Sequence, residues 1–262
     1  MTAMSDNPQN TAILSIVIPV YNERDTWKVL LQRVEQVQLA GIAKQIILVD
    51  DGSSDGTRAQ LEEFAGKAQD LPPFPQAGQT GFKVVFHAKN QGKGAALRTG
   101  FAAATGDVVI IQDADLEYDP SDYPSLAAPI IEGRADVVYG SRFRNGRPPN
   151  TYWKNYAANR LLTAFSNLLT GLKITDMETC YKVFRRPLLQ SINLQQNRFG
   201  FEPEITAKIA ATGARIEEIA ISYVGRTHSE GKKIGWKDGL KALWCIVKYG
   251  LFSRMRKRTT TS

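Results

Sequence analysis

The stretch Ile-Leu-Ser-Ile-Val-Ile-Pro-Val, at residues 13–20, is apolar except for one serine and is rich in β-branched side chains. Such a continuous run is typical of a strand that is buried on both faces of a sheet. Polar residues follow at 22–26, and from Trp27 to Val37 apolar residues recur at helical spacing. A buried strand that leads directly into an amphipathic helix favours a sheet covered by helices.

The same alternation of strand and helix continues through most of the chain. Further strands are predicted at 45–49, 83–87, 107–112 and 136–139, and helices after residue 56, at 93–104 and at 120–132. Beyond residue 150 we expect a helix at 153–168, an irregular segment at 173–186, a helix near 201–212 and a strand near 214–223. These repeated units predict an α/β fold, with a mostly parallel mixed sheet and helices on both faces. The ligand site is then expected beyond the carboxyl ends of the strands.

The composition excludes several classes of protein. In 262 residues, 43% are hydrophobic and 23% charged, which excludes a disordered or fibrous chain. The only cysteines, Cys180 and Cys245, exclude a disulfide framework and a four-cysteine zinc site, and they favour a reducing compartment. Residues 1–12 read as a flexible polar tail without the pattern of a signal peptide. Because no apolar run approaches the roughly 20 residues of a membrane helix, we expect a cytoplasmic protein without a transmembrane segment.

The positive charge is concentrated near the C-terminus. The net charge is +7, and between Lys232 and Arg258 nine residues are basic while one, Asp238, is acidic. The last predicted helix is expected to carry an apolar stripe on one face and lysines on the other; the stripe is Trp236, Leu240, Leu243, Trp244, Val247 and Leu251, and the lysines are Lys237, Lys241 and Lys248. This pattern is typical of a helix that lies on an anionic membrane surface, where each basic residue contributes about 1 kcal/mol. The alternative is that the stripe packs on the core. No nucleic-acid recognition fold accompanies the charge, so no nucleic-acid partner is expected.

Acidic residues cluster at the ends of three predicted strands. The clusters are 21–23 (Tyr-Asn-Glu), 50–51 (Asp-Asp) and 113–117 (Asp-Ala-Asp-Leu-Glu). Carboxylates at strand ends converge on one crevice, and because like charges repel, they need a cation. In an extended chain Asp113, Asp115 and Glu117 would face the same side. Oxygen ligands of this kind favour Mg²⁺ or Mn²⁺, with substrate phosphates completing the shell. The alternative is that these residues only form turns and helix caps.

Four motifs in this order resemble the family-2 glycosyltransferases. They are 16–23 (IVIPVYNE), 49–57 (VDDGSSDGT), 90–97 (NQGKGAAL) and 113–115 (DAD). Within that family the chain is most similar to the dolichol-phosphate mannose synthase and polyprenyl-phosphate glucosyltransferase group, and the likeness runs from about residue 13 to 249. The glycines at 92 and 94 lack the spacing of a P-loop, which excludes a P-loop NTPase. They allow either close approach of anionic groups to a helix N-terminus or close packing of that helix.

The resemblance implies a Rossmann-like GT-A fold that binds a nucleotide-sugar at residues 13–225. The nucleotide-binding half is expected at about 13–142 and the acceptor-side half at about 143–225, followed by a basic lid loop and the amphipathic helix and tail at 226–262. The residues that would line the base and ribose pocket are Pro19, Tyr21, Glu23, Asp50 and Asp51. Asp113, Asp115 and Glu117 would hold the metal on the diphosphate, with Ala114 between them and Asn90 and Lys93 nearby. Glu117 replaces the glutamine of some mannosyl relatives, so this position does not identify the sugar.

Further candidates belong to the acceptor side. Arg142 follows the strand at 136–139, and the resemblance assigns phosphate binding there, which suits the guanidinium fork; the alternative is a surface arginine. Asp176 is the candidate acid–base residue, and Glu202 faces either the sugar or a structural partner. In the predicted lid, Arg226, Ser229 and Lys232 would clamp a phosphate, whereas His228 is expected to be an exposed loop residue.

Together these features predict a metal-dependent, inverting transfer of a hexose from an NDP-sugar, of the UDP-glucose or GDP-mannose type, to a polyprenyl or dolichyl phosphate. The reaction is expected at the cytoplasmic membrane face, by a peripheral protein that could form a homo-oligomer. A phosphate acceptor is already mostly ionised at neutral pH and needs little help from a base. One alternative is the same fold acting on a soluble hydroxyl acceptor. A more remote one is an inactive nucleotide-binding scaffold, against which the intact pair Asp113 and Asp115 argues.

Overall fold

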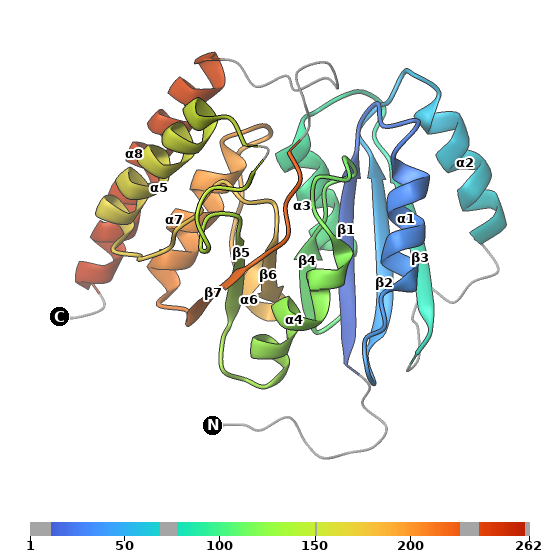
Figure 1. Cartoon of the computed structure of the whole chain (residues 1–262), viewed down its shortest axis with the longest axis horizontal. Helices are drawn as coiled ribbons and strands as arrows, with labels where there is room; N and C mark the ends of the chain where they lie inside the picture. The colour runs from blue at the N-terminus through green and yellow to red at the C-terminus, as the bar shows by residue number, and fades with distance from the viewer. Residues whose placement is uncertain (1–11, 69–77, 150, 226–235, 260–262) are drawn as a thin grey trace.

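The computed structural model describes residues 12–68, 78–149, 151–225 and 236–259. This part of the chain forms a seven-stranded sheet in the order β3-β2-β1-β4-β6-β5-β7 (Figure 1). The strands are β1 (Ile13–Val20), β2 (Ala43–Asp50), β3 (Thr80–Phe86), β4 (Val108–Ile111), β5 (Val137–Ser141), β6 (Lys182–Arg185) and β7 (Ile216–Ala220). Strands β1 to β4 pair in parallel, as do β5 and β7. The predicted α/β fold with a mostly parallel, mixed sheet is confirmed.

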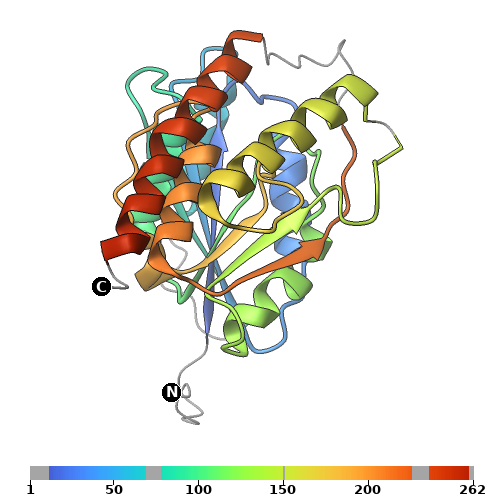
Figure 2. The same ribbon diagram turned by 90° about the vertical axis from the view of Figure 1, so that its left-hand side faces the viewer.

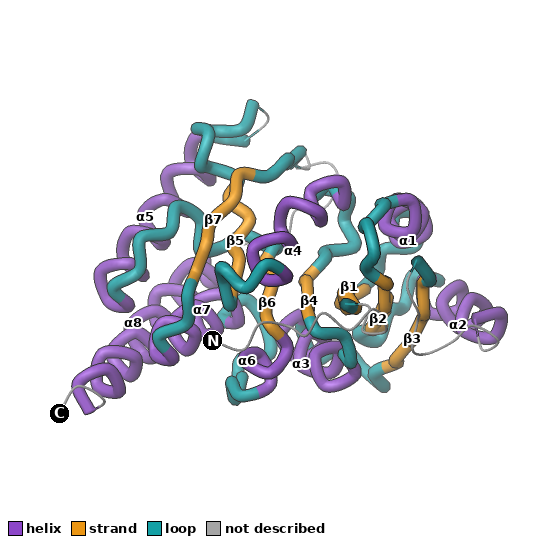
Figure 3. The backbone as a smooth tube through the Cα atoms, turned by 90° about the horizontal axis from the view of Figure 1, so that it is seen from below, coloured by secondary structure: helices purple, strands orange, loops and turns teal. Residues whose placement is uncertain are grey.

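Helices cover both faces of the sheet. They are α1 (Trp27–Gln36), α2 (Thr57–Ala68), α3 (Lys93–Ala103), α4 (Tyr123–Ile131), α5 (Trp153–Thr170), α6 (Arg186–Gln190), α7 (Phe201–Thr212) and α8 (Trp236–Thr259), with a 3₁₀ turn at Pro120–Asp122. Seen from below, α1 and α4 lie on one face of the sheet and α3 and α6 on the other (Figure 3). Helices α5, α7 and α8 stack together at the β7 end (Figures 1 and 2).

One strand was not predicted from the sequence. The segment 173–186, predicted to be irregular, contains β6, which pairs antiparallel with β4 and with β5. The strand has only four residues and begins and ends with a charged residue, so it lacks an apolar run. Its first residue, Lys182, is nevertheless fully buried. Because β6 runs against its neighbours, residues 175–181 enter the sheet at the edge where β4 and β5 end. This places the acceptor-side segment beside the predicted site.

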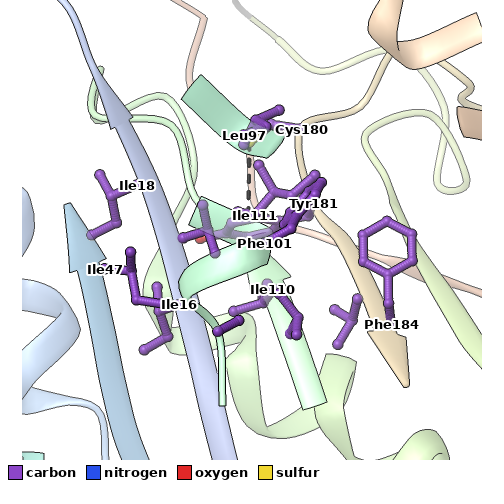
Figure 4. Close-up of a cluster of buried hydrophobic side chains, with 14 of the residues drawn as sticks. Ile16, Ile18, Ile47, Leu97, Phe101, Ile110, Ile111, Cys180, Tyr181 and Phe184 are labelled. Atoms are coloured by element: carbon purple, nitrogen blue, oxygen red, sulfur yellow. Dashed lines mark hydrogen bonds between the residues drawn. The ribbon is translucent and has the colours of Figure 1, made fainter. Parts of the chain in front are cut away.

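The hydrophobic core lies between the sheet and its helices. Figure 4 shows α3 placing Leu97 and Phe101 over β1 and β4, where Ile16 and Ile110 are fully buried. Phe101 also meets Phe184 of β6 edge-on, with ring centroids 6.2 Å apart. The same core continues to Ile246 of α8. Because these contacts hold α3 in place, they also position the loop that leads into it.

The contact between α3 and β1 depends on a glycine, and substitution there is expected to be costly. A Cβ at Gly100 would lie 2.2 Å from Cγ1 of Val17. Gly100→Ala is therefore expected to lower the free energy of unfolding by about 1 to 3 kcal/mol, measured by urea denaturation. The matched control is Gly66→Ala in α2, where a Cβ meets nothing within 4 Å and helix propensity favours alanine. Equal stability changes in the two variants would contradict this packing.

Helix α8 packs through the face opposite its predicted apolar stripe. Ala242, Cys245, Ile246 and Tyr249 are buried, whereas Leu240, Leu243, Trp244, Val247 and Leu251 are exposed, Leu240 by 55% and Trp244 by 57%. The alternative that the stripe packs on the core is therefore wrong for these five residues. Gly250 allows a close approach of Leu169 from α5. No helix in the described ranges has an apolar stretch long enough to cross a bilayer.

Candidate active site

Loops after β1, β2, β4 and β5 share one edge of the sheet, the upper edge in Figure 1. The pairing of β1 with β2 places Val20 beside Asp50, so the first two predicted clusters are neighbours. The backbone N–H of Ser53 donates a hydrogen bond to Oδ1 of Asp50, at 3.1 Å. Arg58 reaches Oδ2 of the same carboxylate at 3.5 Å. Asp50 is fully buried here, at the carboxyl end of β2.

The other residues predicted to line a base and ribose pocket lie on or after β1. Pro19 lies opposite Val49 in the parallel register of β1 and β2. Tyr21 is exposed at the mouth of the site. Glu23 accepts a hydrogen bond from the Thr26 hydroxyl at the start of α1. The structure therefore brings Pro19, Tyr21 and Glu23 to one side of the buried Asp50.

Asp51 holds the loop that leads into α3. Its carboxylate accepts hydrogen bonds from the backbone N–H groups of Gln91 at 3.0 Å and Gly92 at 2.7 Å. The Nδ1 atom of His87 lies 2.7 Å from Oδ1 of Asp51. The His87 ring in turn contacts the Thr99 hydroxyl at 2.9 Å. His87 could not be singled out from the sequence, because its contact with Asp51 joins segments far apart in the chain.

The glycines at 92 and 94 serve close packing. A Cβ on Gly92 would lie 2.3 Å from the backbone oxygen of Asn197, and one on Gly94 would lie 2.3 Å from that of Gln196. Gly92 also has φ of 101°, which favours glycine. The N–H of Ala95 donates to Asn197 at 3.2 Å. This supports the packing alternative, since the loop at 195–198 covers the start of α3.

Lys93 joins two acidic residues across the site. Its ammonium lies 2.8 Å from Oδ2 of Asp113 and 3.4 Å from Oε1 of Glu202. Burial opposes the charged form of Lys93, but Asp113 and Glu202 outweigh it and hold its pKa well above the usual value. The predicted site residues Lys93, Asp113 and Glu202 are thus brought together from α3, the β4 loop and α7.

The segment after β4 is a turn rather than an extended strand. Leu116 has φ of 61°, and the N–H of Glu117 donates to Oδ1 of Asp115 at 3.2 Å. The expectation that an extended chain aligns Asp113, Asp115 and Glu117 is therefore wrong. One oxygen of Glu117 accepts a hydrogen bond from the Tyr223 hydroxyl at 2.9 Å. Ala114, between the two aspartates, is buried. As a metal ligand, Glu117 stays a prediction.

The carboxylates after β4 suit a hard divalent cation. Across the described ranges, no three Asp, Glu, His or Cys side chains form a complete metal cluster. Magnesium commonly binds through one or two carboxylates, with substrate phosphates supplying the remaining ligands. Asp113 and Asp115 provide such a pair, one residue apart in the turn. The donor set therefore fits a metal that binds together with a diphosphate.

Arg142 and Asp176 form a buried two-point ion pair. The guanidinium Nε and Nη2 lie 2.7 and 2.8 Å from the two oxygens of Asp176, and the N–H of Arg142 adds a bond of 3.1 Å. The Arg142 side chain is 10% exposed, so the alternative of a surface arginine is wrong. Its charge also lies over the ring of Tyr223, 5.2 Å from the centroid. Burial opposes the charge of Arg142, yet Asp176 and its neighbours keep its pKa well above normal.

Two further charged residues lie here that the sequence did not single out. Burial raises the pKa of the Glu178 carboxyl to about 7, and the negative charge of Glu202 contributes to this shift. Burial lowers the pKa of Lys182, although Glu202 and Glu178 partly oppose this. The Lys182 ammonium donates to the backbone oxygen of Thr179 and lies 5.3 Å from the centroid of the Tyr139 ring. A charged side chain at the start of a buried strand was the available signal for Lys182.

The predicted lid residues Arg226, Ser229 and Lys232, together with His228, lie outside the described residues. Asn90, which precedes the glycine loop, lines a groove beside that loop. The remaining candidates meet at one edge of the sheet.

Comparisons with known proteins identify the family of the chain. The profile described as glycosyl transferase family 2 matches residues 15–192. The chain is 26% identical to dodecaprenyl-phosphate galacturonate synthase of Rhizobium johnstonii, over 97% of this chain and 71% of that protein. It is 34% identical to undecaprenyl-phosphate 4-deoxy-4-formamido-L-arabinose transferase of Pseudomonas fluorescens, over 84% and 59%. It is 29% identical to dolichol-phosphate mannosyltransferase of Pyrococcus furiosus, over 85% and 59%.

The fold is also shared with a solved structure. Glucosyl-3-phosphoglycerate synthase from Mycobacterium tuberculosis, in complex with Mn²⁺, UDP and glucosyl-3-phosphoglycerate, matches with a TM-score of 0.64 and 18% identity, over 91% of this chain and 80% of that one. The fold and the edge site define a glycosyltransferase of the GT-A class. The chain belongs to glycosyl transferase family 2. It spans 59% to 71% of the length of the three relatives named above.

Proposed function

We propose that this glycosyltransferase moves a hexose from a nucleoside-diphosphate sugar to a polyprenyl or dolichyl phosphate at the cytoplasmic membrane face. The observation that carries the proposal is the pairing of two distinct phosphate-binding elements at one edge of the sheet. Asp113 and Asp115 suit a metal-bound diphosphate, and Arg142, which directly follows β5, supplies a guanidinium held in place by Asp176. The names of the three relatives each include a polyprenyl or dolichol phosphate, which supports the acceptor class.

On the donor side, Pro19, Tyr21, Glu23, Asp50 and Asp51 would line the base and ribose pocket. Asp113 and Asp115 would hold Mg²⁺ or Mn²⁺, which would supply positive charge where the nucleoside diphosphate departs. Lys93 adds a fixed cation 2.8 Å from Asp113. Preorganised charge of this kind stabilises a leaving group without reorganisation during the reaction.

On the acceptor side, an oxygen of the lipid phosphate would form a bond to the anomeric carbon. The bond between that carbon and the diphosphate oxygen would break, and the nucleoside diphosphate would leave with the electron pair. A single displacement of this kind inverts the anomeric configuration. Because the acceptor oxygen is already ionised, no proton need be removed. Both oxygens of Asp176 are engaged by Arg142, so we assign Asp176 the positioning of Arg142 rather than the role of a base.

The exposed face of α8 supports docking to an anionic membrane surface. Leu240, Leu243, Trp244, Val247 and Leu251 are exposed on one face, and the lysines at 241 and 248 are exposed beside it. A groove of about 700 Å³ beside α8 is lined by Trp244, Phe199 and Gly200, among other residues. Basic residues Lys89, Arg198 and Lys241 line it. Aromatic side chains in this groove suit the isoprenoid chain of a lipid acceptor, and the cations suit an anionic membrane surface.

Membrane docking through α8 is expected to fail when its exposed face is made acidic. The double variant Leu240→Glu/Trp244→Glu is expected to reduce sedimentation with anionic phosphatidylglycerol vesicles more than 10-fold, because each lost apolar side chain removes about 1.5 kcal/mol or more. Val29→Glu, at an exposed position on α1, is the matched control. Equal sedimentation of the double variant and the control would exclude this surface.

A donor screen tests the proposed function itself. UDP- and GDP-sugars are added to the protein with Mn²⁺ or with EDTA, and the melting temperature is measured. Ligand binding stabilises the folded state by RT ln(1 + [L]/Kd), so a ligand at 100 times its Kd adds about 2.7 kcal/mol. We expect a metal-dependent rise for one nucleotide class, and transfer of its sugar to undecaprenyl phosphate. Transfer to a soluble hydroxyl acceptor, with none to the lipid phosphate, would overturn the proposed acceptor.

A further inference from the structure

The chain that leaves β7 crosses to the turn that follows β4 (Figure 1). Tyr223 forms an antiparallel bridge with Tyr118, and the N–H of Val224 donates to the backbone oxygen of Glu117 at 2.9 Å. The rings of Tyr223 and Tyr118 also meet edge-on, with their centroids 5.3 Å apart. These contacts hold Tyr223 against the turn that carries the predicted metal ligands.

The two parts of the Tyr223 side chain contact two different parts of the site. Its hydroxyl donates a hydrogen bond of 2.9 Å to Oε2 of Glu117. Its ring lies against the Arg142 guanidinium, whose central carbon is 5.2 Å from the ring centroid. Burial and then the charge of Glu117 raise the pKa of Tyr223, so the hydroxyl stays protonated and acts as the donor. One side chain therefore joins the metal turn to the cation proposed to bind the acceptor phosphate.

The hydroxyl of Tyr223 acts on the metal side of the site. Glu117 is a predicted metal ligand, and the hydrogen bond from Tyr223 restricts the orientation of its carboxylate. Groups that hydrogen-bond a metal-ligating carboxylate orient it, and their removal typically lowers metal affinity or activity by about 10- to 100-fold. Tyr223 stands in this relation to Glu117.

The ring of Tyr223 acts on the acceptor side of the site. Both oxygens of Asp176 hold the Arg142 guanidinium from one direction. The face of the Tyr223 ring attracts the same cation, and a contact of this kind changes an equilibrium constant by roughly 2- to 30-fold, depending on its exposure. Asp176 and the ring together hold the guanidinium in one orientation.

We propose that Tyr223 is a positioning residue for both halves of the site: its hydroxyl orients Glu117 for the metal, and its ring orients Arg142 for the acceptor phosphate. This inference rests on the proposed function and gives Tyr223 no contact with the reacting atoms. Because the two tasks belong to different parts of one side chain, substitutions can remove them one at a time. Tyr223→Phe removes the hydroxyl and keeps the ring, whereas Tyr223→Leu removes both.

The test measures metal binding and acceptor use separately. Mn²⁺ is titrated at a fixed concentration of UDP or GDP, whichever binds, and the Mn²⁺ concentration that gives half of the rise in melting temperature is recorded. Transfer kinetics give kcat and the KM for undecaprenyl phosphate. The variants are Tyr223→Phe, Tyr223→Leu, Glu117→Ala and the double variant Glu117→Ala/Tyr223→Phe. Tyr139→Phe is the matched control, because it removes a buried hydroxyl that is hydrogen-bonded to Thr206 at 3.0 Å.

Tyr223→Phe is expected to raise the half-effective Mn²⁺ concentration about 10-fold or more, and to leave the KM for undecaprenyl phosphate within about 2-fold of the wild type. Tyr223→Leu is expected to show the same metal defect together with a KM raised about 5-fold or more. The double variant is expected to match Glu117→Ala, because the hydroxyl acts through Glu117. If Tyr223→Leu does not fold, Tyr223→Phe and the double variant carry the test.

A Tyr223→Phe variant that responds to Mn²⁺ as Tyr139→Phe does would overturn the inference, as would a double variant whose two defects multiply. An unchanged KM in a folded Tyr223→Leu variant would overturn the role of the ring. An unchanged Mn²⁺ response in Glu117→Ala would also overturn the inference, but the proposed function would still stand on Asp113 and Asp115. A wild type without metal-dependent nucleotide binding would overturn the proposed function and this inference together.

Discussion

An Asp115→Asn variant is expected to lose at least 100-fold in the rate of sugar transfer, with its fold intact. Asp115 supplies one of the two carboxylates that suit the metal, and its neutral amide is a weaker ligand for a hard cation. Loss of a preorganised group that stabilises the charge on a leaving group typically lowers kcat by a factor of about 100 to 1,000. Asp115 is the cleaner choice, because Asp113 is also an ion-pair partner of Lys93 at 2.8 Å.

The measurement is single-turnover transfer at saturating donor, together with the rise in melting temperature that Mn²⁺ and nucleotide produce. The transfer rate and the metal-dependent rise in melting temperature are both expected to fall in Asp115→Asn. Both are expected to remain in Glu132→Gln, which replaces an exposed carboxylate directly after α4. A variant that keeps both the rate and the metal-dependent stabilisation would exclude Asp115 from the metal site.

Replacing Arg142 by methionine is expected to destabilise the protein by about 3 to 5 kcal/mol. The change leaves the Asp176 carboxylate fully buried without its two-point partner, and an uncompensated buried charge is costly. Adding Asp176→Asn removes that charge. The double variant is therefore expected to recover more than half of the lost stability, as measured by urea unfolding.

Transfer activity separates the two roles of this pair. The double variant is expected to remain about 100-fold below the wild type in transfer, because the cation proposed to bind the acceptor phosphate is still missing. Asp176→Asn alone is expected to lower transfer less than the double variant does, since it keeps the Arg142 cation while losing the carboxylate that positions it. Recovery of activity together with stability in the double variant would show that Arg142 serves only the fold.

Local patterns predicted the scaffold well. The apolar run at β1 and the recurring helical stripes gave the order of strands and helices from β1 to β5 and the edge at which the site lies. The short, charged β6 was missed because its burial depends on pairing with β4 and β5 on both sides, which no local pattern encodes. That strand is what brings Asp176 and Glu178 to the site.

Long-range contacts account for the other differences. The turn at Leu116 and the hydrogen bond between Tyr223 and Glu117 could not be read from an alternating acidic motif. The glycines at 92 and 94 pack against backbone at 196 and 197, a hundred residues later in the chain. Besides the predicted stripe, α8 carries a second set of apolar residues, and it is this second set that meets the core. Its smaller side chains, such as Ala242 and Cys245, face inward.

The most direct test of metal-dependent transfer to a lipid phosphate is a radiolabel extraction. The purified protein is incubated with undecaprenyl phosphate and ¹⁴C-labelled UDP-glucose or GDP-mannose, with Mn²⁺ or with EDTA, and the organic phase is counted. We expect label from one donor to enter the organic phase with Mn²⁺, to disappear with EDTA, and to fall at least 100-fold in Asp115→Asn. Label that enters equally with EDTA, or that stays in the aqueous phase for every donor, would contradict the proposed reaction.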